Sequence, residues 1–273
     1  MYSAYPSGYA PYTNRSAQLQ KKMKYSLVDN VKSEPFKGGK GNCILCGQET
    51  IAKCGTRKVH HWAHKSLKDC DPWWENETEW HRKWKNYFPM EWQEIVHFDD
   101  ITGEKHIADV KTSKGLVIEF QNSPMSIEEL KSREEFYKKM IWIINGKSFQ
   151  KSFHILHKLP NPKADFVNDI AFMGRKKDHK GKLFFRYSEN EENASMVLIH
   201  SVDEIKEEID SNYIGHHLFD WVRPRTVWLN SNCRVFIDFD DDEIWELQTY
   251  DNRGLKCARK YSKDYFVKRA TEK

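Results

Sequence analysis

Two carboxylates at matching positions of neighbouring segments carry the most specific chemistry in this sequence. Asp109 lies in HIADV and Glu119 in LVIEFQ, and a short turn around Lys114 separates the two segments. If the segments pair as a hairpin about Lys114, the two carboxylates lie directly across from one another on one face. Asp, Glu and water are ligands that suit Mg²⁺, with Mn²⁺ as a substitute. The pair therefore predicts a divalent-metal site that activates water against a phosphodiester.

Glu119 is expected to be the more deeply buried of the two. Its neighbours Val117, Ile118 and Phe120 are apolar, which predicts a central strand. An unpaired carboxylate in such a strand costs several kcal/mol, so either a metal or a cation must compensate it. Gln121 projects from the same face, where its amide could orient the attacking water or contact the scissile phosphate.

Glu77 and His81 form a further polar pair just before these strands. They lie in residues 73–88, whose aromatic side chains recur at roughly helical spacing. Asp71-Pro72 is a helix-start signal and Pro89 is a breaker, so we expect a helix of about four turns between them. The pair is spaced i, i+4 and would share one face of this helix, over the carboxylates. A surface hydrogen bond between the two side chains is the alternative.

Cysteine and histidine spacing predicts a second metal site. Cys43 and Cys46 form a CxxC pair whose thiolates can bind one Zn²⁺, which leaves two positions of a tetrahedral site to fill. The candidates for these positions are His61, His64 and Cys70. A strand through the two histidines would point them to opposite faces and favour His64 with Cys70, whereas a turn between them would let both bind.

Disulfides and redox chemistry are less favoured roles for these cysteines. Clustered cysteines in a chain that looks intracellular indicate a metal rather than disulfides, and buried free thiols are the alternative. A redox dithiol is disfavoured because Gly-Gln, and no helix start, follows Cys46. Cys54 and His60 are weaker ligand candidates because neither has a partner at ligand spacing.

The hydrophobic pattern predicts the elements that position these residues. After the helix at 73–88, we expect strands at 91–98, 106–112 and 116–121, a helix from Ser126 to about 139, and a strand at 140–144. Further strands are predicted at 183–187, 195–200, 234–238 and 243–249, with a helix at 202–211. The acidic segment 238–243 is either a metal loop or, as we prefer, a turn.

These elements suggest four regions. Residues 1–38 are predicted to be a disordered basic tail, 39–72 a zinc-binding knuckle, 73–150 a metal-binding α/β core, and 151–273 a mixed, β-rich C-terminal α+β region of unassigned role. Residues 1–42 carry seven Lys or Arg against two acidic residues, whereas the whole chain has a net charge of +4. This arm either holds a phosphate backbone without sequence preference or is only a solvated tail.

The hydrophobic pattern argues against a membrane-spanning helix. Hydrophobic residues make up 39% of the 273 residues, enough for a sizeable core, yet no apolar run is long enough for a membrane span. The first residues lack the apolar stretch of a secretory signal. We therefore expect a cytoplasmic location.

Seven elements in a fixed order resemble the CoiA-like competence proteins. They are CILC, KCGTRK, HWAH followed by the cysteine of SLKDC, ENETEWH, HIADV, VIEFQNS, and Arg133 to Tyr137, over about residues 43–145. The resemblance implies a restriction-endonuclease-like PD-(D/E)xK core (helix, three-strand meander, helix, strand) with a structural zinc knuckle before it. It implies a Mg²⁺-dependent DNA nuclease that acts in DNA uptake, recombination or the processing of foreign DNA.

The resemblance also assigns roles to individual residues. Glu77 and His81 match the helix motif, Asp109 the metal-binding aspartate and Glu119 the second acid, while Gln121 stands where many such nucleases have lysine. Lys85 or Lys111 could supply the cation that is missing at Gln121. The sequence also departs from the family pattern at three further positions. The positions are Thr78 for serine, Trp62 for phenylalanine, and His106 where an arginine is expected.

Two other functions fit the same residues. The chain could be a non-catalytic module that binds DNA or a recombination partner, with a structural zinc site and a vestigial acidic pair. It could also be a structural zinc protein that contacts another protein. Salt-dependent DNA affinity separates the last function from the others.

Overall fold

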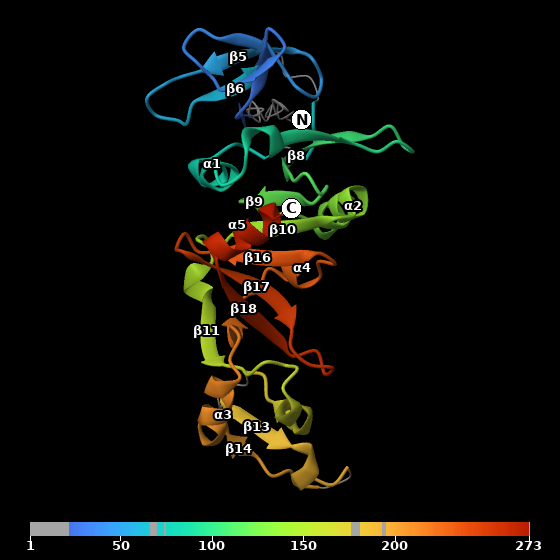
Figure 1. Cartoon of the computed structure of the whole chain (residues 1–273), viewed down its shortest axis with the longest axis vertical. Coiled ribbons are helices and arrows are strands. Elements are labelled where there is room, and N and C mark those ends of the chain that lie inside the picture. The colour runs from blue at the N-terminus through green and yellow to red at the C-terminus, as the bar shows by residue number, and fades with distance from the viewer. Residues whose placement is uncertain (1–21, 66–69, 74, 176–180, 193–194, 273) are drawn as a thin grey trace, which may run out of the picture. The chain divides into compact units, whose positions relative to one another are not determined.

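The described residues divide into two units, a first unit that ends at Pro72 and a second unit that begins at Trp73. The structure is a computed structural model that describes residues 22–65, 70–73, 75–175, 181–192 and 195–272 (Figure 1). Residues 1–21, most of the predicted basic tail, lie outside the described residues.

The first unit is a six-stranded antiparallel sheet in the order β1-β6-β5-β4-β2-β3. Its strands are β1 (Lys22–Met23), β2 (Ser26–Val28), β3 (Val31–Ser33), β4 (Lys40–Asn42), β5 (Glu49–Lys53) and β6 (His61–His64). Three of them lie within residues 22–38, where the sequence predicts a disordered tail. Met23 is buried and pairs with Trp62 of β6, so this segment completes the core of the unit. At Gly41 a Cβ would lie 2.6 Å from the Leu27 carbonyl oxygen, so only glycine lets β4 approach β2 this closely.

The second unit is built on a nine-stranded mixed sheet in the order β11-β15-β18-β17-β16-β10-β9-β8-β7. The first part of the chain supplies α1 (Glu79–Lys85), β7 (Gln93–Phe98), β8 (Lys105–Lys111), β9 (Val117–Gln121), α2 (Ile127–Tyr137) and β10 (Met140–Asn145). Strands β7, β8 and β9 form the expected antiparallel meander, and β10 returns parallel to β9 after α2. The predicted order of helix, three strands, helix and strand is therefore present in this mixed α/β unit.

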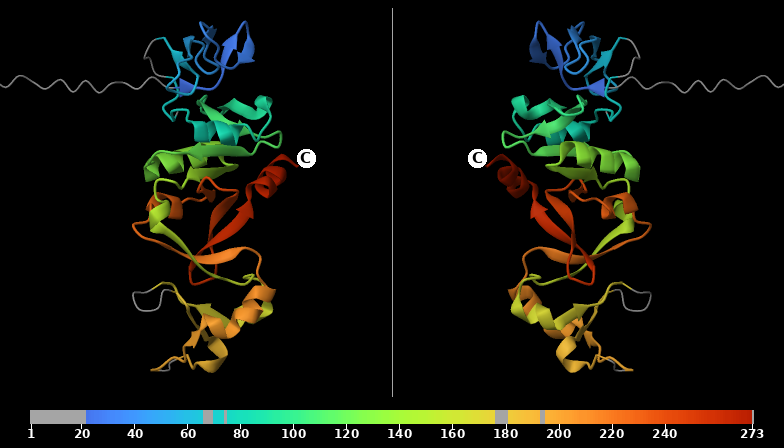
Figure 2. Two further views of the ribbon diagram at one scale, coloured as in Figure 1. Left: turned by 90° about the vertical axis from the view of Figure 1, so that its left-hand side faces the viewer. Right: turned by 90° about the vertical axis from the view of Figure 1, so that its right-hand side faces the viewer.

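The same sheet continues with strands from the last third of the chain. These are β11 (Phe153–Lys158), β15 (His216–Trp221), β16 (Arg234–Asp238), β17 (Glu243–Thr249) and β18 (Lys256–Ser262), followed by α5 (Lys263–Thr271). Strand β16 lies parallel to β10, so one sheet holds strands from both sides of residue 150, where the sequence predicts a boundary. Figure 2 shows these strands continuing the sheet of the first part. The sequence predicts β16 and β17 with these bounds but misses β11, β15, β18 and α5.

A small three-stranded sheet lies between β11 and β15 in sequence. It contains β12 (Ile170–Phe172), β13 (Leu183–Arg186) and β14 (His200–Ser201), next to η5 (Val202–Ile205) and α3 (Lys206–Ser211). The prediction of a strand over 195–200 is wrong, because only His200 is in a strand and Met196 is 85% exposed. The remaining short helices are η1 (Met90–Trp92), η2 (Gln150–Ser152), η3 (Asp165–Asp169), η4 (Tyr187–Glu189) and α4 (Thr226–Leu229).

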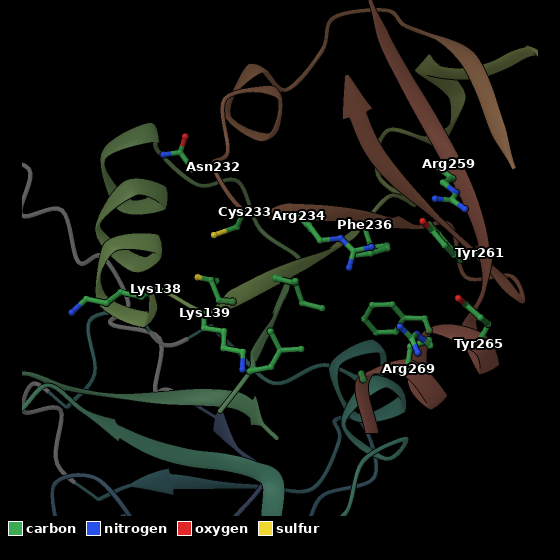
Figure 3. Close-up of a pocket in the computed structure, with 15 residues that line it drawn as sticks. Lys138, Lys139, Asn232, Cys233, Arg234, Phe236, Arg259, Tyr261, Tyr265 and Arg269 are labelled. Carbon is green, nitrogen blue, oxygen red and sulfur yellow. The ribbon is translucent and has the colours of Figure 1, made fainter. Parts of the chain in front are cut away.

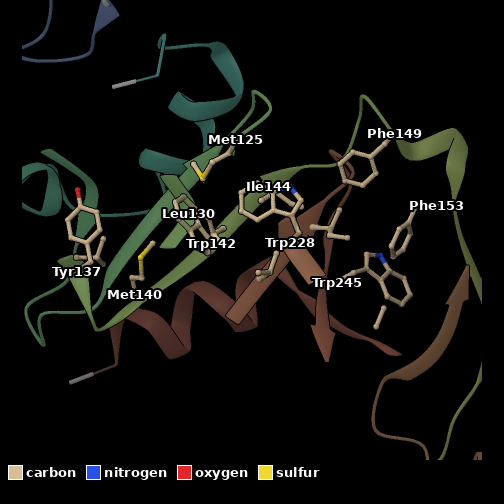
Figure 4. Close-up of a cluster of buried hydrophobic side chains, with 14 of the residues drawn as sticks. Met125, Leu130, Tyr137, Met140, Trp142, Ile144, Phe149, Phe153, Trp228 and Trp245 are labelled. Carbon is tan, nitrogen blue, oxygen red and sulfur yellow. The ribbon is translucent and has the colours of Figure 1, made fainter. Parts of the chain in front are cut away.

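Separate apolar clusters cover the two faces of the large sheet. On one face, Trp142 and Ile144 of β10 pack with Leu130 of α2 and Trp228 of α4 (Figure 4). The other face bears a cluster made by β9, β10, β16 and helices α1 and α5, with members Trp84, Ile118, Ile141, Phe236 and Phe266.

One buried carboxylate ties α1 and α5 to the sheet. Oδ2 of Asp238 accepts hydrogen bonds from the indole N–H groups of Trp80 and Trp84, at 2.7 Å each. Its Oδ1 lies 2.8 Å from the ammonium of Lys263 and accepts the backbone N–H of Asp240. Residues 238–243 therefore form a turn between β16 and β17, as preferred from the sequence, and Asp238 is its structural anchor.

Replacing Asp238 with alanine should strongly destabilise the second unit. The change leaves two indole donors and a nearly buried ammonium without their acceptor, so we expect the free energy of unfolding to fall by about 3–5 kcal/mol. Urea denaturation followed by tryptophan fluorescence measures this loss. Lys83→Ala on α1 removes an exposed ion pair to Asp240 and is the control, with an expected change below about 1 kcal/mol. Equal effects of the two substitutions would contradict the assignment.

Candidate active site

Helix α1 begins later than the sequence predicts, and this changes the position of Glu77. The hydroxyl of Thr78 accepts the backbone N–H of His81 and caps the helix, which then starts at Glu79. Glu77 thus precedes the helix, and the prediction that Glu77 and His81 share one helical face is wrong. The reason lies in Glu75, whose carboxylate accepts the backbone N–H groups of Asn122 and Ser123 and holds this segment extended against the end of β9.

The predicted hairpin register of the two carboxylates is confirmed. Val110 pairs with Ile118 and Lys111 with Val117, so Asp109 and Glu119 occupy the next opposed positions. Here side chains replace the backbone ladder: Glu119 Oε1 accepts the Asp109 N–H at 3.1 Å, and Asp109 Oδ2 accepts the Phe120 N–H at 3.0 Å. The reciprocal bonds fix both carboxylates between the strands.

A third carboxylate stands beside them. Gln93 pairs with Val110 and Ile95 with Ala108, so Glu94 of β7 lies across from Asp109 in the meander. Glu94 is buried and has a φ of 44°, a conformation that is rare for a non-glycine residue and is often found at functional sites. Glu94 was not predicted, although the alternation in EWQEIVHF and the length of the β7–β8 turn place it in this register.

The ammonium of Lys85 lies among these acids. Its Nζ is 2.8 Å from Glu77, 2.9 Å from Glu94 and 3.0 Å from Asp109. Burial by itself lowers the pKa of Lys85, but the three carboxylates outweigh it and hold the pKa well above its usual range. Burial is also the main cause that raises the pKa of Glu77. Lys85 is therefore a fixed positive charge at the centre of three acids.

Arg133 of α2 supplies the cation for Glu119. Its Nη1 lies 3.4 Å from Glu119 Oε2, and its Nη2 donates to the Trp73 carbonyl and to Glu129. The sequence left open whether a metal or a cation compensates Glu119, and the structure provides a cation. Arg133 entered the sequence analysis only through the family pattern.

His81 and Gln121 complete the polar surroundings. Nε2 of His81 lies 3.0 Å from Glu75 and 3.2 Å from the Phe120 carbonyl, while its Nδ1 is 2.7 Å from the Thr78 hydroxyl. Gln121 donates to Glu75 and to Ser123. Burial raises the pKa of Glu75, but the hydrogen bond and charge of His81 and the Ser123 and Asn122 donors lower it overall. Glu75 was not predicted, because its role depends on an extended segment where the sequence predicts a helix.

A small cavity lies where these side chains meet. It has a volume of about 20 Å³, which is room for one water molecule. Its polar lining consists of Glu75, Glu77, His81, Asp109, Glu119 and Arg133. Among the described residues, Glu77 Oε1 has no hydrogen-bond donor, and the nearest cation on this oxygen is Arg82 Nε at 3.6 Å. The cavity is therefore bordered by a carboxylate oxygen with unused acceptor capacity.

Four of the five predicted zinc ligands lie close together in the first unit. The ligand atoms of Cys43, Cys46, His64 and Cys70 all lie within 4.8 Å of one another, a group that could bind a metal such as zinc. Cys43 Sγ is 3.6 Å from Cys70 Sγ, and Cys46 Sγ is 3.3 Å from His64 Nε2. The Cys70 thiol lowers the pKa of Cys43, and the same contact raises the pKa of Cys70.

His61 is the predicted ligand that the group excludes. Residues His61–His64 form strand β6, so the two histidines point to opposite faces, as one of the two sequence alternatives required. Nδ1 of His61 lies 2.8 Å from the Val59 carbonyl. His61 instead borders an open hollow formed by residues 52–58, which contain Lys53, Arg57 and Lys58.

The comparison with known families agrees with the resemblance found in the sequence. Residues 98–213 match the family model for the competence protein CoiA, nuclease-like domain, and this segment includes Asp109, Glu119 and Gln121 but not Glu77 or His81. No curated protein and no solved structure matches the chain. The resemblance to CoiA-like proteins is thus confirmed.

Within the described part of the chain, the structure contains no helix with the length and apolar character needed to span a bilayer.

The two histidines of β6 should differ in their effect on metal content. His64→Ala removes one of four clustered ligands, so we expect purified protein to lose most of its zinc and the first unit to lose stability. His61→Ala is the matched control on the same strand and should retain about one zinc per chain, because four ligands fill a tetrahedral structural site. Elemental analysis of both variants checks this, and zinc loss in His61→Ala alone would show that the ligand set is different.

Proposed function

We propose that this protein, which carries the CoiA nuclease-like domain, is a divalent-metal-dependent DNA nuclease with a PD-(D/E)xK-type core. One observation carries the proposal: Asp109 and Glu119 are locked side by side across two strands, beside a cavity that Glu77 also borders. The family match supports DNA as the substrate and a role in DNA uptake or recombination, or in processing foreign DNA.

The donor set fits Mg²⁺ or Mn²⁺. The cavity offers carboxylate oxygens from Asp109, Glu119 and Glu77, and an all-oxygen set with room for water suits these cations. Glu77 Oε1 has acceptor capacity that a cation could use. When bound by Asp109 and Glu119, the metal would supply Lewis-acid activation of water and of the phosphodiester.

The protein's own residues would orient the reacting groups. The side chain of Asp109 is 22% exposed, whereas that of Glu119 is 6% exposed, so a phosphate can reach the site on the Asp109 side. His81 is fixed by Thr78 and Glu75 and could take or give a proton at Nε2. Gln121 is held by Glu75 and Ser123, which positions its amide for a water or a phosphate oxygen.

Lys85 takes the role of the lysine that is absent at position 121. Its Nζ lies 3.0 Å from Asp109, although it comes from α1 rather than from β9. A fixed cation here would stabilise negative charge that develops on the phosphate. Neither Lys85 nor Lys111, the two lysines considered from the sequence, lines the cavity, and the contact with Asp109 favours Lys85.

The first unit would serve as a zinc-stabilised DNA-holding module. Four clustered ligands replace a large apolar core in a unit of this size. Lys53, Arg57 and Lys58 border the open hollow on its β5–β6 loop and offer positive charge to a phosphate backbone.

A non-catalytic DNA-binding module, one that could also recruit recombination proteins, is the second candidate. A specific observation favours it: Asp109 and Glu119 each already form an ion pair with a protein cation, Lys85 and Arg133 respectively, without a metal. The two candidates make opposite predictions for cleavage, whereas both predict DNA affinity that falls with salt.

Cleavage should require Asp109. We expect labelled DNA, single- or double-stranded, to be cut with Mg²⁺ or Mn²⁺ and not with EDTA, and Asp109→Asn to lower the rate at least about 100-fold with DNA affinity retained. Asp100→Asn in the exposed β7–β8 turn is the control and should cut normally. Well-folded, zinc-loaded wild type that binds but never cuts DNA would favour the non-catalytic module.

Replacing Lys85 with methionine should couple stability to divalent cations. The variant keeps the apolar stem but removes the ammonium that Glu77, Glu94 and Asp109 share, so its melting temperature should fall and cleavage should drop at least about 100-fold. Because a bound cation can replace the ammonium, Mn²⁺ should raise the melting temperature of Lys85→Met more than that of wild type. Lys83→Met, two residues away and exposed, should show neither effect. An equal Mn²⁺ effect on both variants would contradict a metal site here.

A further inference from the structure

A second, larger cavity of the Trp73–Lys273 unit is basic and aromatic. It has a volume of about 600 Å³, within the usual size of ligand sites (Figure 3). Its described lining contains five cationic residues and no acidic one: Lys138, Lys139, Arg234, Arg259 and Arg269. The cavity shares no lining residue with the carboxylate cavity.

The cations are only partly neutralised by nearby acids. Arg234 forms a bidentate pair with buried Glu246, and Arg269 pairs with Glu272. Within the described part of the chain, no carboxylate forms a salt bridge with Lys138, Lys139 or Arg259. The Lys139 ammonium donates to the Lys114 carbonyl, and Arg259 Nε donates to the Ile214 carbonyl, and these contacts leave the charges in place. The cavity therefore has an excess of positive charge.

Aromatic rings stand beside these charges. The Arg234 guanidinium lies 5.0 Å from the centre of the Phe236 ring, and that of Arg259 lies 5.0 Å from the Tyr261 ring. Tyr265 of α5 stacks on Tyr261 with an interplanar angle of 8°, and its side chain is half exposed. Figure 3 shows that β16, β18, α5 and the segment after α2 supply these side chains. A flat ring that enters the cavity can stack on an exposed tyrosine while an attached anion reaches arginine and lysine.

The location separates this cavity from the proposed catalytic carboxylates. Of its lining residues, Met140 and Arg234 are the first residues of the parallel strands β10 and β16, and Leu116 directly precedes β9. Glu119 lies further along β9, and its side chain faces the α2 side of the sheet, whereas Ile141 and Phe236 of the cavity belong to the opposite face. A ligand here leaves the catalytic carboxylates free.

We infer that this cavity binds a nucleotide unit, with its phosphates on Lys139, Arg234 and Arg259 and its base on Tyr265. Phosphate and base together account for both features of the lining, since a simple anion would need no aromatic platform and an apolar ligand no excess charge. The unit is either a free nucleotide or one nucleotide of a single strand. Binding requires no carboxylate of the proposed active site, so it stands or falls independently of cleavage.

The inference is tested by calorimetric titration of the zinc-loaded full chain. The ligands are ATP, a short oligothymidylate and pyrophosphate, each titrated without added Mg²⁺. We expect Tyr265→Ala and Arg259→Gln each to weaken binding of ATP or the oligonucleotide roughly tenfold, the loss of one stacking or charged contact. Lys268→Ala on α5 lies outside the cavity and should bind as wild type does. Asp109→Asn should also bind normally, which distinguishes this site from the nuclease site.

Comparing ATP with the oligonucleotide shows whether the site binds a free nucleotide or a nucleotide within a strand. Loss of ATP binding in the variants indicates a free nucleotide, and a loss confined to the oligonucleotide indicates a strand. If pyrophosphate binds as tightly as ATP and Tyr265→Ala does not change the affinity for ATP, the site does not recognise the base. Unchanged affinity of well-folded Tyr265→Ala and Arg259→Gln for every ligand would overturn the site.

Discussion

The buried ammonium of Lys85 is the interaction on which the polar centre of this protein depends. Glu77, Glu94 and Asp109 all lie within 3.0 Å of its Nζ. Carboxylates that all contact one buried ammonium lie close to one another, and like charges that close cannot all stay ionised in a buried site without a cation among them. Because Glu94 and Asp109 belong to neighbouring strands and Glu77 to the segment before α1, one side chain joins the meander to the helix that covers it.

The carboxylates gain position as well as charge compensation from this arrangement. Asp109 and Glu119 each bind a backbone N–H of the opposite strand, and Arg133 restrains Glu119 from α2. Functional groups held by packed elements on several sides keep a fixed geometry, which is a requirement for a metal site. The same bonds explain why a carboxylate pair can persist between two strands in a largely apolar sheet.

The sequence predicts the local part of this site and misses the part that depends on distant contacts. The short turn around Lys114 is enough to place Asp109 opposite Glu119, because hairpin register is a short-range property. Glu75 and the late start of α1 depend on hydrogen bonds to residues 122 and 123, which no local pattern records. Strands β11, β15 and β18 were missed because their residues are polar on one or both faces, and pairing within a wide sheet decides their conformation. The catalytic roles remain predictions.

The parallel pairing of β10 with β16 has a consequence for how the protein is made. Ile141 of β10 pairs with Ile118, which is already synthesised, and with Arg234, which comes much later. Until β16 is available, a growing chain exposes an open and apolar edge of β10, the kind of edge that recruits strands from other chains. Such long-range pairing also slows folding. The pace of the ribosome between these two strands therefore sets how long the nascent protein is exposed to aggregation.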